Sequence, residues 1–128
     1  MLTTIQVLSL REDRIMKALV QDRATSDSVS DESTVVFQAA AELFAMLSTP
    51  IRLRVLSSLC EQEKNVSQLL SEINASQSNL SQHLNAMYRA GILAKRREGA
   101  MIFYAIRNQQ AVTVCRSVCS QIAMDFEH

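Results

Sequence analysis

The sequence predicts a mainly α-helical domain that carries a small β-hairpin. Only two of the 128 residues are glycine and one is proline, a composition that favours helices. Both glycines mark breaks in the pattern: Gly91 ends a helical repeat, and Gly99 separates two short strand-like runs at 92–98 and 101–106. Several helices, then a hairpin, then a last helix predict a winged helix-turn-helix with an α-α-α-α-β-β-α core.

Residues 34–126 form the predicted domain, and its helices have local signals. Apolar residues recur at helical spacing along them. Thr49 can cap a helix whose first residue is Pro50, and Ser76 can cap the helix that Gly91 ends. The helices are predicted at residues 34–47, 50–62, 65–73, 76–91 and 109–126.

Residues 1–33 are predicted to be an N-terminal extension, flexible or partly helical. The segment 15–20 fits a short amphipathic turn, whereas residues 24–33, ATSDSVSDES, are typical of a flexible acidic linker. Met16 is a candidate translation start, which would make residues 1–15 a spurious extension.

The predicted helix 76–91 has one apolar side and one polar side. At about 100° of rotation per residue, Leu80, Leu84, Met87, Tyr88 and Gly91 share the side that can pack on the domain. The opposite side is rich in amide and hydroxyl groups, which hydrogen-bond base edges and phosphates. Its members are Ser78, Ser81, Gln82, Asn85 and Arg89. The alternative is a solvated surface helix of another α-domain, which would more usually carry Glu and Lys pairs.

An α-helix fits the major groove of B-DNA, and the residues near its N-terminus reach the bases first. Gln82 is the best candidate for base readout, and the hydroxyls of Ser76, Ser78 and Ser81 are candidates for phosphate contacts. We expect the His83 ring to pack at the groove edge. The predicted DNA-binding residues are Ser76, Gln77, Ser78, Asn79, Ser81, Gln82, His83, Asn85, Arg89, Lys95, Arg96 and Arg97.

The distribution of charge also favours double-stranded DNA as a partner. The net charge is zero, but residues 76–107 hold five basic residues against one acidic residue. Lys95, Arg96 and Arg97 precede the tip of the hairpin and can follow the DNA backbone or enter the minor groove; the alternative is a solvated hairpin. The absence of a long apolar run or signal peptide predicts no membrane partner and a cytoplasmic protein whose cysteines are thiols.

Apolar residues at helical spacing predict a homodimer through the terminal helices. One face comprises Val112, Cys115, Cys119, Ile122 and Ala123, and another comprises Phe37, Ala41 and Phe44. These faces exceed what one small core needs to bury. A single module makes few phosphate contacts, so we expect two copies to bind an inverted-repeat operator.

Several segments resemble the ArsR/SmtB family of small winged-helix repressors. The similar stretches run from Leu47 to Leu56, from Ser76 to Leu84, from Arg89 to Leu93, and over Arg96-Arg97-Glu98-Gly99 with Tyr104. The resemblance covers residues 36–122 and implies a homodimeric repressor that a small inorganic inducer releases from DNA. Such inducers are metal ions, metalloids, or reactive sulfur or oxygen species. One departure is Ala100, where the family often has another basic residue.

The family's metal sites do not carry over to this chain. The cysteine positions of the arsenic-sensing branch resemble Asn65 and Ser67 here, which are not soft ligands. The zinc-ligand positions on the last helix hold Asn108, Gln110, Gln121 and Met124. We therefore expect no metal site of either kind and no cofactor.

The three cysteines, Cys60, Cys115 and Cys119, are the remaining candidates for sensing. Cys115 and Cys119 are four residues apart, so they share one side of a helix. The thiol-sensing branch of the family has one cysteine on each of the two corresponding helices, near Ser57 and Ala123 here. The resemblance implies release by a persulfide or an oxidant. Binding of a soft metalloid such as trivalent arsenic is an alternative.

A purely structural role for these cysteines is the third interpretation. Cys60 continues the expected buried stripe of Leu53, Leu56 and Leu59, while Arg52 is predicted to face elsewhere. Buried cysteine behaves as a small apolar residue.

Two other classes of function are weaker. A winged helix that binds a protein partner, without an inducer, would not need arginines beside a Gln/Ser helix. An enzyme is not expected, because the chain has no Gly-rich phosphate loop and no Cys/His cluster or Ser/His/acid constellation.

Overall fold

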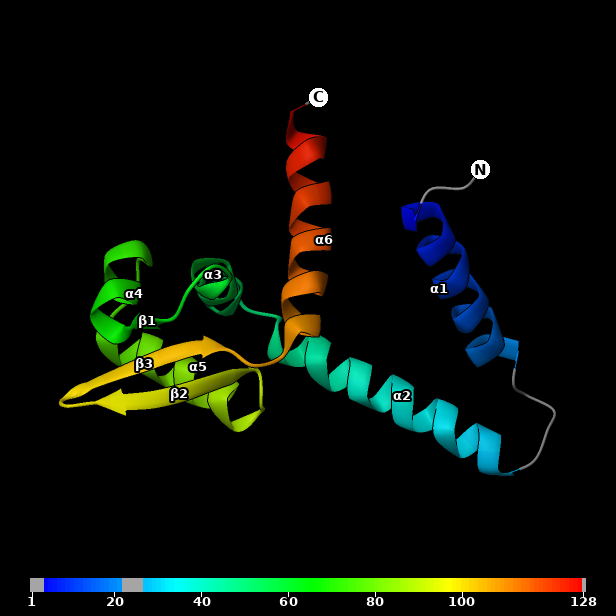
Figure 1. Cartoon of the computed structure of the whole chain (residues 1–128), viewed down its shortest axis with the longest axis horizontal. Coiled ribbons are helices and arrows are strands. Elements are labelled where there is room, and N and C mark those ends of the chain that lie inside the picture. The colour runs from blue at the N-terminus through cyan, green and yellow to red at the C-terminus, as the bar shows by residue number, and fades with distance from the viewer. Residues whose placement is uncertain (1–3, 22–26, 128) are drawn as a thin grey trace. The chain divides into compact units, whose positions relative to one another are not determined.

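The computed structural model of the chain describes residues 4–21 and 27–127. The chain divides into two compact units, Met1–Glu42 and Leu43–His128, and each is described by itself. Figure 1 shows the order of the elements, in which helices precede a hairpin and a last helix. The elements are α1 (Thr4–Gln21), α2 (Asp27–Met46), α3 (Pro50–Leu59), β1 (Lys64–Asn65), α4 (Val66–Glu72), α5 (Gln77–Arg89), β2 (Leu93–Glu98), β3 (Met101–Ile106) and α6 (Gln109–Phe126).

The first unit is more helical than the sequence predicted. Residues 15–20 belong to α1, which is 18 residues long, and the Ser33 hydroxyl donates to the carbonyl of Leu19 at 3.3 Å. The predicted linker 24–33 is wrong from Asp27 onward, because α2 begins there, seven residues before the expected start at 34. Hydroxyl residues suit the N-cap of a helix, and acidic residues in its first turn interact favourably with the helix dipole, so the same composition fits a helix start. Residues 22–26 lie outside the described part.

The helices of the second unit begin at the caps that the sequence indicates. The Thr49 hydroxyl accepts from the Arg52 N–H at 3.3 Å, with Pro50 as the first helical residue. The Ser76 hydroxyl accepts from the Asn79 N–H at 3.1 Å, and Asn65 forms a capping box at the start of α4. These predicted winged helix-turn-helix elements are confirmed.

The hairpin is part of a three-stranded antiparallel sheet in the order β1-β3-β2. β2 and β3 pair from Leu93↔Ile106 to Glu98↔Met101, which leaves a two-residue turn. Gly99 occupies the first turn position with a φ of +62°, a conformation that glycine adopts without strain. The short strand β1 was not predicted, because its two residues are too few for a periodic pattern.

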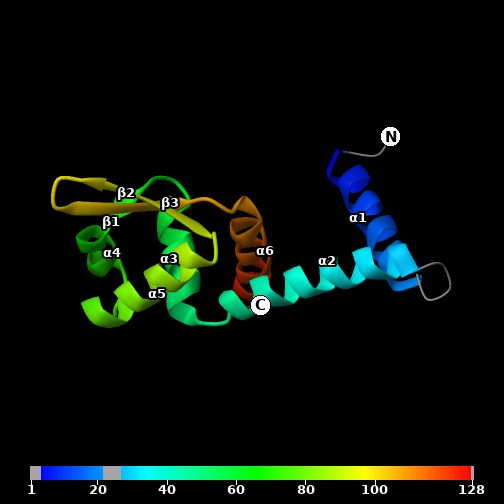
Figure 2. The same ribbon diagram turned by 90° about the horizontal axis from the view of Figure 1, so that it is seen from below.

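The core of the second unit lies between α3, α4, α5 and the sheet (Figure 2). Its largest fully buried side chains are Leu56, Leu69, Leu80, Leu84, Met87, Ile92, Leu93 and Val55. The predicted stripe on α3 is only partly correct, because Leu53 is half-buried and Cys60 is exposed. The reason is that α3 ends at Leu59 instead of 62, so Cys60 is the C-cap and does not continue the helical repeat.

Within the described residues, no single helix is long and apolar enough to cross a membrane. The bent pair Asp31–Met46 and Pro50–Leu59 meets that criterion together, by length and composition only.

Candidate nucleic-acid interface and thiol pocket

The polar side of α5 is exposed over its whole length. Leu80, Leu84 and Met87 have no accessible surface and fix the opposite side of the helix in the core. Tyr88, expected on the packed side, is 38% exposed. The exposed polar residues are Ser76, Gln77, Ser78, Asn79, Ser81, Gln82, Asn85 and Arg89. From its N-terminus onward, the helix therefore presents amide and hydroxyl groups that can donate and accept hydrogen bonds.

The side chain of His83 on α5 is hydrogen-bonded by Arg52 of α3. Arg52 Nε donates to His83 Nδ1 at 3.0 Å, and Arg52 Nη1 donates to the Met46 carbonyl at 3.0 Å. Because Nδ1 is the acceptor, a neutral His83 ring carries its proton on Nε2. Arg52 was predicted to lie off the buried stripe of α3, and its bond to His83 was not predicted. The sequence holds no signal for this contact, since the two residues are 31 positions apart.

The three basic residues of β2 differ in their surroundings. Lys95 Nζ lies 4.3 Å from the centroid of the Tyr88 ring of α5, and Arg97 Nε donates to the Gly99 carbonyl at 3.1 Å. Arg96 instead pairs with Glu63 and Glu98. Because side chains alternate along a strand, Lys95 and Arg97 share one face of the sheet and Arg96 lies on the other. The predicted basic cluster is thus divided between two faces.

A separate ion pair anchors the short strand β1 to α4. Lys64 Nζ donates to the two carboxylate oxygens of Glu72 at 2.7 and 2.9 Å, and the Ser58 hydroxyl also bonds Glu72. These hydrogen bonds, that of Lys64 foremost, hold the pKa of Glu72 below its usual value. The edge strand β1 is therefore tied to α4.

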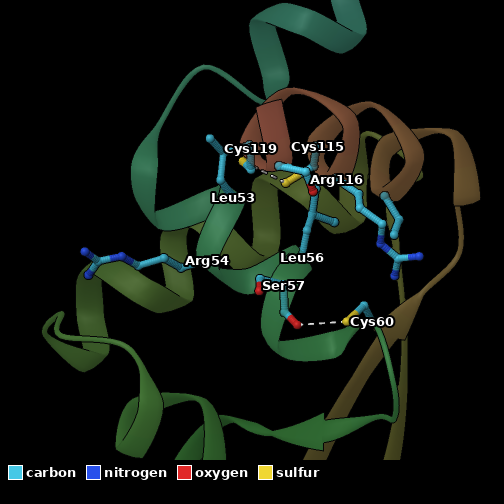
Figure 3. Close-up of a pocket in the computed structure, with 10 residues that line it drawn as sticks. Leu53, Arg54, Leu56, Ser57, Cys60, Cys115, Arg116 and Cys119 are labelled. Carbon is cyan, nitrogen blue, oxygen red and sulfur yellow. Dashed lines mark hydrogen bonds between the residues drawn. The ribbon is translucent and has the colours of Figure 1, made fainter. Parts of the chain in front are cut away.

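All three cysteines line one pocket of about 340 Å³ between α3 and α6 (Figure 3). Cys115 and Cys119 project from α6, with 3.8 Å between their sulfurs. Cys60 lies at the end of α3 and its thiol donates to the Ser57 carbonyl at 3.0 Å. The other lining residues are Leu53, Arg54, Leu56, Ser57, Val112, Arg116 and Ser120.

The thiols are unequal in chemistry. Burial, with smaller effects from the hydrogen bond to Cys119 and from the charges of Cys119 and Cys60, raises the pKa of Cys115 to about 11. Cys60 and Cys119 are exposed. Among the described residues, no group of three His, Cys, Asp or Glu side chains is arranged to hold a metal ion. The pocket as it stands therefore offers thiols for covalent chemistry and no assembled trio of ligands.

The comparisons with known proteins agree with this geometry. The family profile described as "Bacterial regulatory protein, arsR family" matches residues 49–95. An uncharacterized HTH-type transcriptional regulator of Mycobacterium tuberculosis, Rv0081, is 36% identical over 98 residues, which cover 73% of this chain and 86% of that protein.

Solved structures are similar over the same part of the chain. The transcriptional repressor BigR from Xylella fastidiosa is 29% identical with a TM-score of 0.62, covering 76% of this chain and 95% of that one. Reduced HlyU from Vibrio cholerae is 29% identical with a TM-score of 0.64, covering 68% and 92%. The expectation that the protein is not an enzyme is confirmed by these relationships. The chain belongs to the ArsR/SmtB family of winged helix-turn-helix DNA-binding transcriptional regulators.

Proposed function

We propose that the protein is a homodimeric, cytoplasmic repressor that binds an inverted-repeat operator and leaves it when its cysteines are modified. The observation that carries the DNA-binding part is the exposed polar side of α5, which begins at the Ser76 cap. Gln82 is the proposed base-reading residue, because its amide can bond an adenine with two hydrogen bonds. Lys95 and Arg97 of the hairpin, on one face of the sheet, are the proposed phosphate contacts.

Exposed apolar side chains on α6 support the homodimer. Val118, Ile122 and Met124 are 53%, 50% and 57% exposed, and Phe44 near the end of α2 is 58% exposed. Val118 and Ile122, four positions apart, lie on one side of α6, and exposed apolar side chains that share a helix side are often covered by a partner. A second copy is the proposed partner, because two-fold symmetry matches an inverted repeat.

The proposed sensor is the thiol pocket. An oxidant such as hydrogen peroxide converts one thiol to a sulfenic acid with loss of water, and condensation with a second thiol forms an S–S bond and releases another water. Cys60 comes from α3, and Cys115 and Cys119 come from α6, so a bond between the two groups would join these helices. Since α3 also contacts α5, such a bond can alter the presentation of α5 to DNA.

The test combines DNA release with mass analysis. Reduced protein bound to an operator selected from random duplexes is treated with polysulfide, peroxide or arsenite, and release is followed by fluorescence anisotropy. Intact mass and peptide mapping identify the modified residue. We expect release by polysulfide or peroxide, and its loss in Cys60→Ser or Cys119→Ser with DNA affinity retained. Normal release by both variants would eliminate the thiol sensor.

Two alternative functions are separated by the same experiment. Release by arsenite alone would favour a metalloid sensor in which the thiols rearrange around the ion. A protein-interaction module predicts weak duplex binding with little dependence on salt, whereas a DNA-binding protein loses affinity steeply as salt rises.

A further inference from the structure

Arg96 is the most heavily engaged basic residue of the hairpin. Its Nε donates to the two carboxylate oxygens of Glu63 at 3.0 and 2.8 Å, and its Nη1 donates to Glu98 at 2.9 Å. The guanidinium carbon also lies 4.4 Å from the centroid of the Phe103 ring. Two carboxylates and an aromatic face thus surround one guanidinium.

The charge of this cluster does not suit a phosphate contact. One positive charge stands against the two carboxylates of Glu63 and Glu98, so the cluster is net negative. The hydrogen bond from Arg96 holds the pKa of Glu63 below its usual range. A DNA phosphate would have to displace a carboxylate that is already bound with good geometry.

The position of Arg96 in the sheet leads to the same conclusion. Lys95 and Arg97 project from the face that bears the buried Leu93 and the contact with Tyr88 of α5. Arg96 projects from the opposite face, together with Phe103, its partner across the strands. The residues proposed to meet DNA and Arg96 therefore lie on different sides of the hairpin.

Glu63 belongs to the segment between α3 and β1, which lies outside the hairpin. Its ion pair with Arg96 spans 33 positions and joins β2 to that segment. The other hairpin strand, β3, is tied to the same region by its pairing with β1 and by the bond from Asn65 Nδ2 to Met101 Sδ at 3.3 Å. The Glu63–Arg96 pair adds a link to β2, the strand that carries Lys95 and Arg97, and can thus restrict the position of that strand.

We propose that Arg96 is a positioning residue, held by Glu63 and Glu98, that aims the hairpin so that Lys95 and Arg97 meet DNA phosphates. This inference rests on the proposed docking of α5 and the hairpin on DNA. It removes Arg96 from the set of direct phosphate contacts and adds Glu63, an acidic residue, to the residues that support DNA binding.

The test uses the full-length protein and the substitution Glu63→Gln. A purely electrostatic effect and a positioning role of Glu63 predict changes in DNA affinity of opposite sign. Glu63→Gln makes the protein more positive, which by itself strengthens binding to DNA. If Glu63 holds the hairpin in place, the same change weakens binding, by about twofold to fivefold for an exposed pair. Glu61→Gln, an exposed carboxylate two positions away, removes the same charge and is the matched control.

Duplex affinity is measured by anisotropy over a series of KCl concentrations, after circular dichroism has shown that each variant is folded. We expect Glu63→Gln and Arg96→Gln both to weaken binding, Arg96→Gln more so because it also removes a positive charge. The double variant should bind no more weakly than Arg96→Gln alone. Glu61→Gln should bind as tightly as the wild type or slightly more tightly. In Arg97→Gln, the slope of the logarithm of the binding constant against the logarithm of the salt concentration should become less steep by about 0.9 per lost phosphate contact.

A spectroscopic measurement reports on Arg96 directly. Its Nε–H signal in a ¹H–¹⁵N spectrum should be protected from exchange, keep its shift when duplex is added, and broaden in Glu63→Gln.

The results separate two failures. Tighter binding and a steeper salt dependence in Glu63→Gln, with Arg97→Gln weakened as expected, would overturn only the inference and make Arg96 a phosphate contact restrained by Glu63. If Arg97→Gln and Lys95→Gln leave binding unchanged, the hairpin does not meet DNA, and the proposed docking fails together with the inference.

Discussion

Cys115 should react with alkylating agents more slowly than an ordinary cysteine, although it lies in a pocket with two other thiols. Only the thiolate attacks iodoacetamide, and the pKa of Cys115 is raised from 9.0 to about 11. At any pH below 9, this increase of two pKa units lowers the fraction of Cys115 that is thiolate about a hundredfold. A more basic thiolate is a better nucleophile, which recovers about sixfold to tenfold. The net expectation is a rate about tenfold lower, before any steric hindrance.

The assay is a pH–rate profile by peptide mapping. The protein is labelled with iodoacetamide between pH 7 and 10, and the rate at Cys115 is compared with the rate at the same residue in urea. The logarithm of the folded-state rate should rise by about one per pH unit through the whole range, because a group with a pKa of about 11 does not finish ionising below pH 10.

A matched variant separates the causes of the raised pKa. Cys119→Ala removes the smaller contribution from the neighbouring thiol, including its hydrogen bond, but leaves the burial, which is the largest. Cys115 should then react faster than in the wild type but still more slowly than in urea. A profile that levels off near pH 9, or a folded-state rate equal to the unfolded rate at pH 7.5, would refute the reasoning. If the slow rate is observed, the first attack on an inducer belongs to Cys60 or Cys119, and Cys115 acts as the resolving thiol.

Three further predictions concern α5 and its supports. Gln82→Ala should reduce discrimination between operator and random duplex by about 1–3 kcal/mol in competition binding, without changing the dimer mass; equal discrimination would contradict a base-reading role. Ser76→Ala should lower the free energy of unfolding by about 1 kcal/mol in urea, because it removes the N-cap hydroxyl, whereas Ser76→Asn should not. Arg52→Lys should lower that free energy on the order of 1 kcal/mol and change the ¹⁵N ring shifts of His83; unchanged shifts would mean that Arg52 does not fix the ring tautomer.

The parts of the fold that the sequence predicted correctly depend on local chemistry. Thr49 before Pro50, and Ser76 three residues before Asn79, are cap signals that act within one helical turn. Gly91 has a φ of +78°, and glycine is the residue type that ends a helix in this conformation. The polar side of α5 was readable because an apolar stripe on the other side fixes its orientation.

The contacts that the sequence did not reveal join residues far apart in the chain. Arg52 with His83, and Glu63 with Arg96, are separated by 31 and 33 positions, and a charged side chain can satisfy its hydrogen bonds in many ways. Periodicity therefore places such a residue on a surface but does not identify its partner. Because side chains alternate between the two faces of a strand, the sequence of β2 could have predicted that Lys95 and Arg97 lie on one face and Arg96 on the other. The early end of α3, which leaves Cys60 exposed, has no clear signal in the residues 60–63.

The position of α3 explains how chemistry in the thiol pocket can affect DNA binding. One side of α3 lines the pocket through Leu53 and Leu56, and Cys60 caps its C-terminal end. At its other end, Arg52 bonds the ring of His83 on α5. A covalent bond that pulls α3 toward α6 must either stretch the Arg52–His83 hydrogen bond or move α5 with it, since close-packed cores transmit displacement and do not absorb it. In the first case α5 loses a contact that holds the His83 ring, and in the second the side of α5 proposed to read bases changes its position relative to the sheet. Neither case requires a separate signalling element.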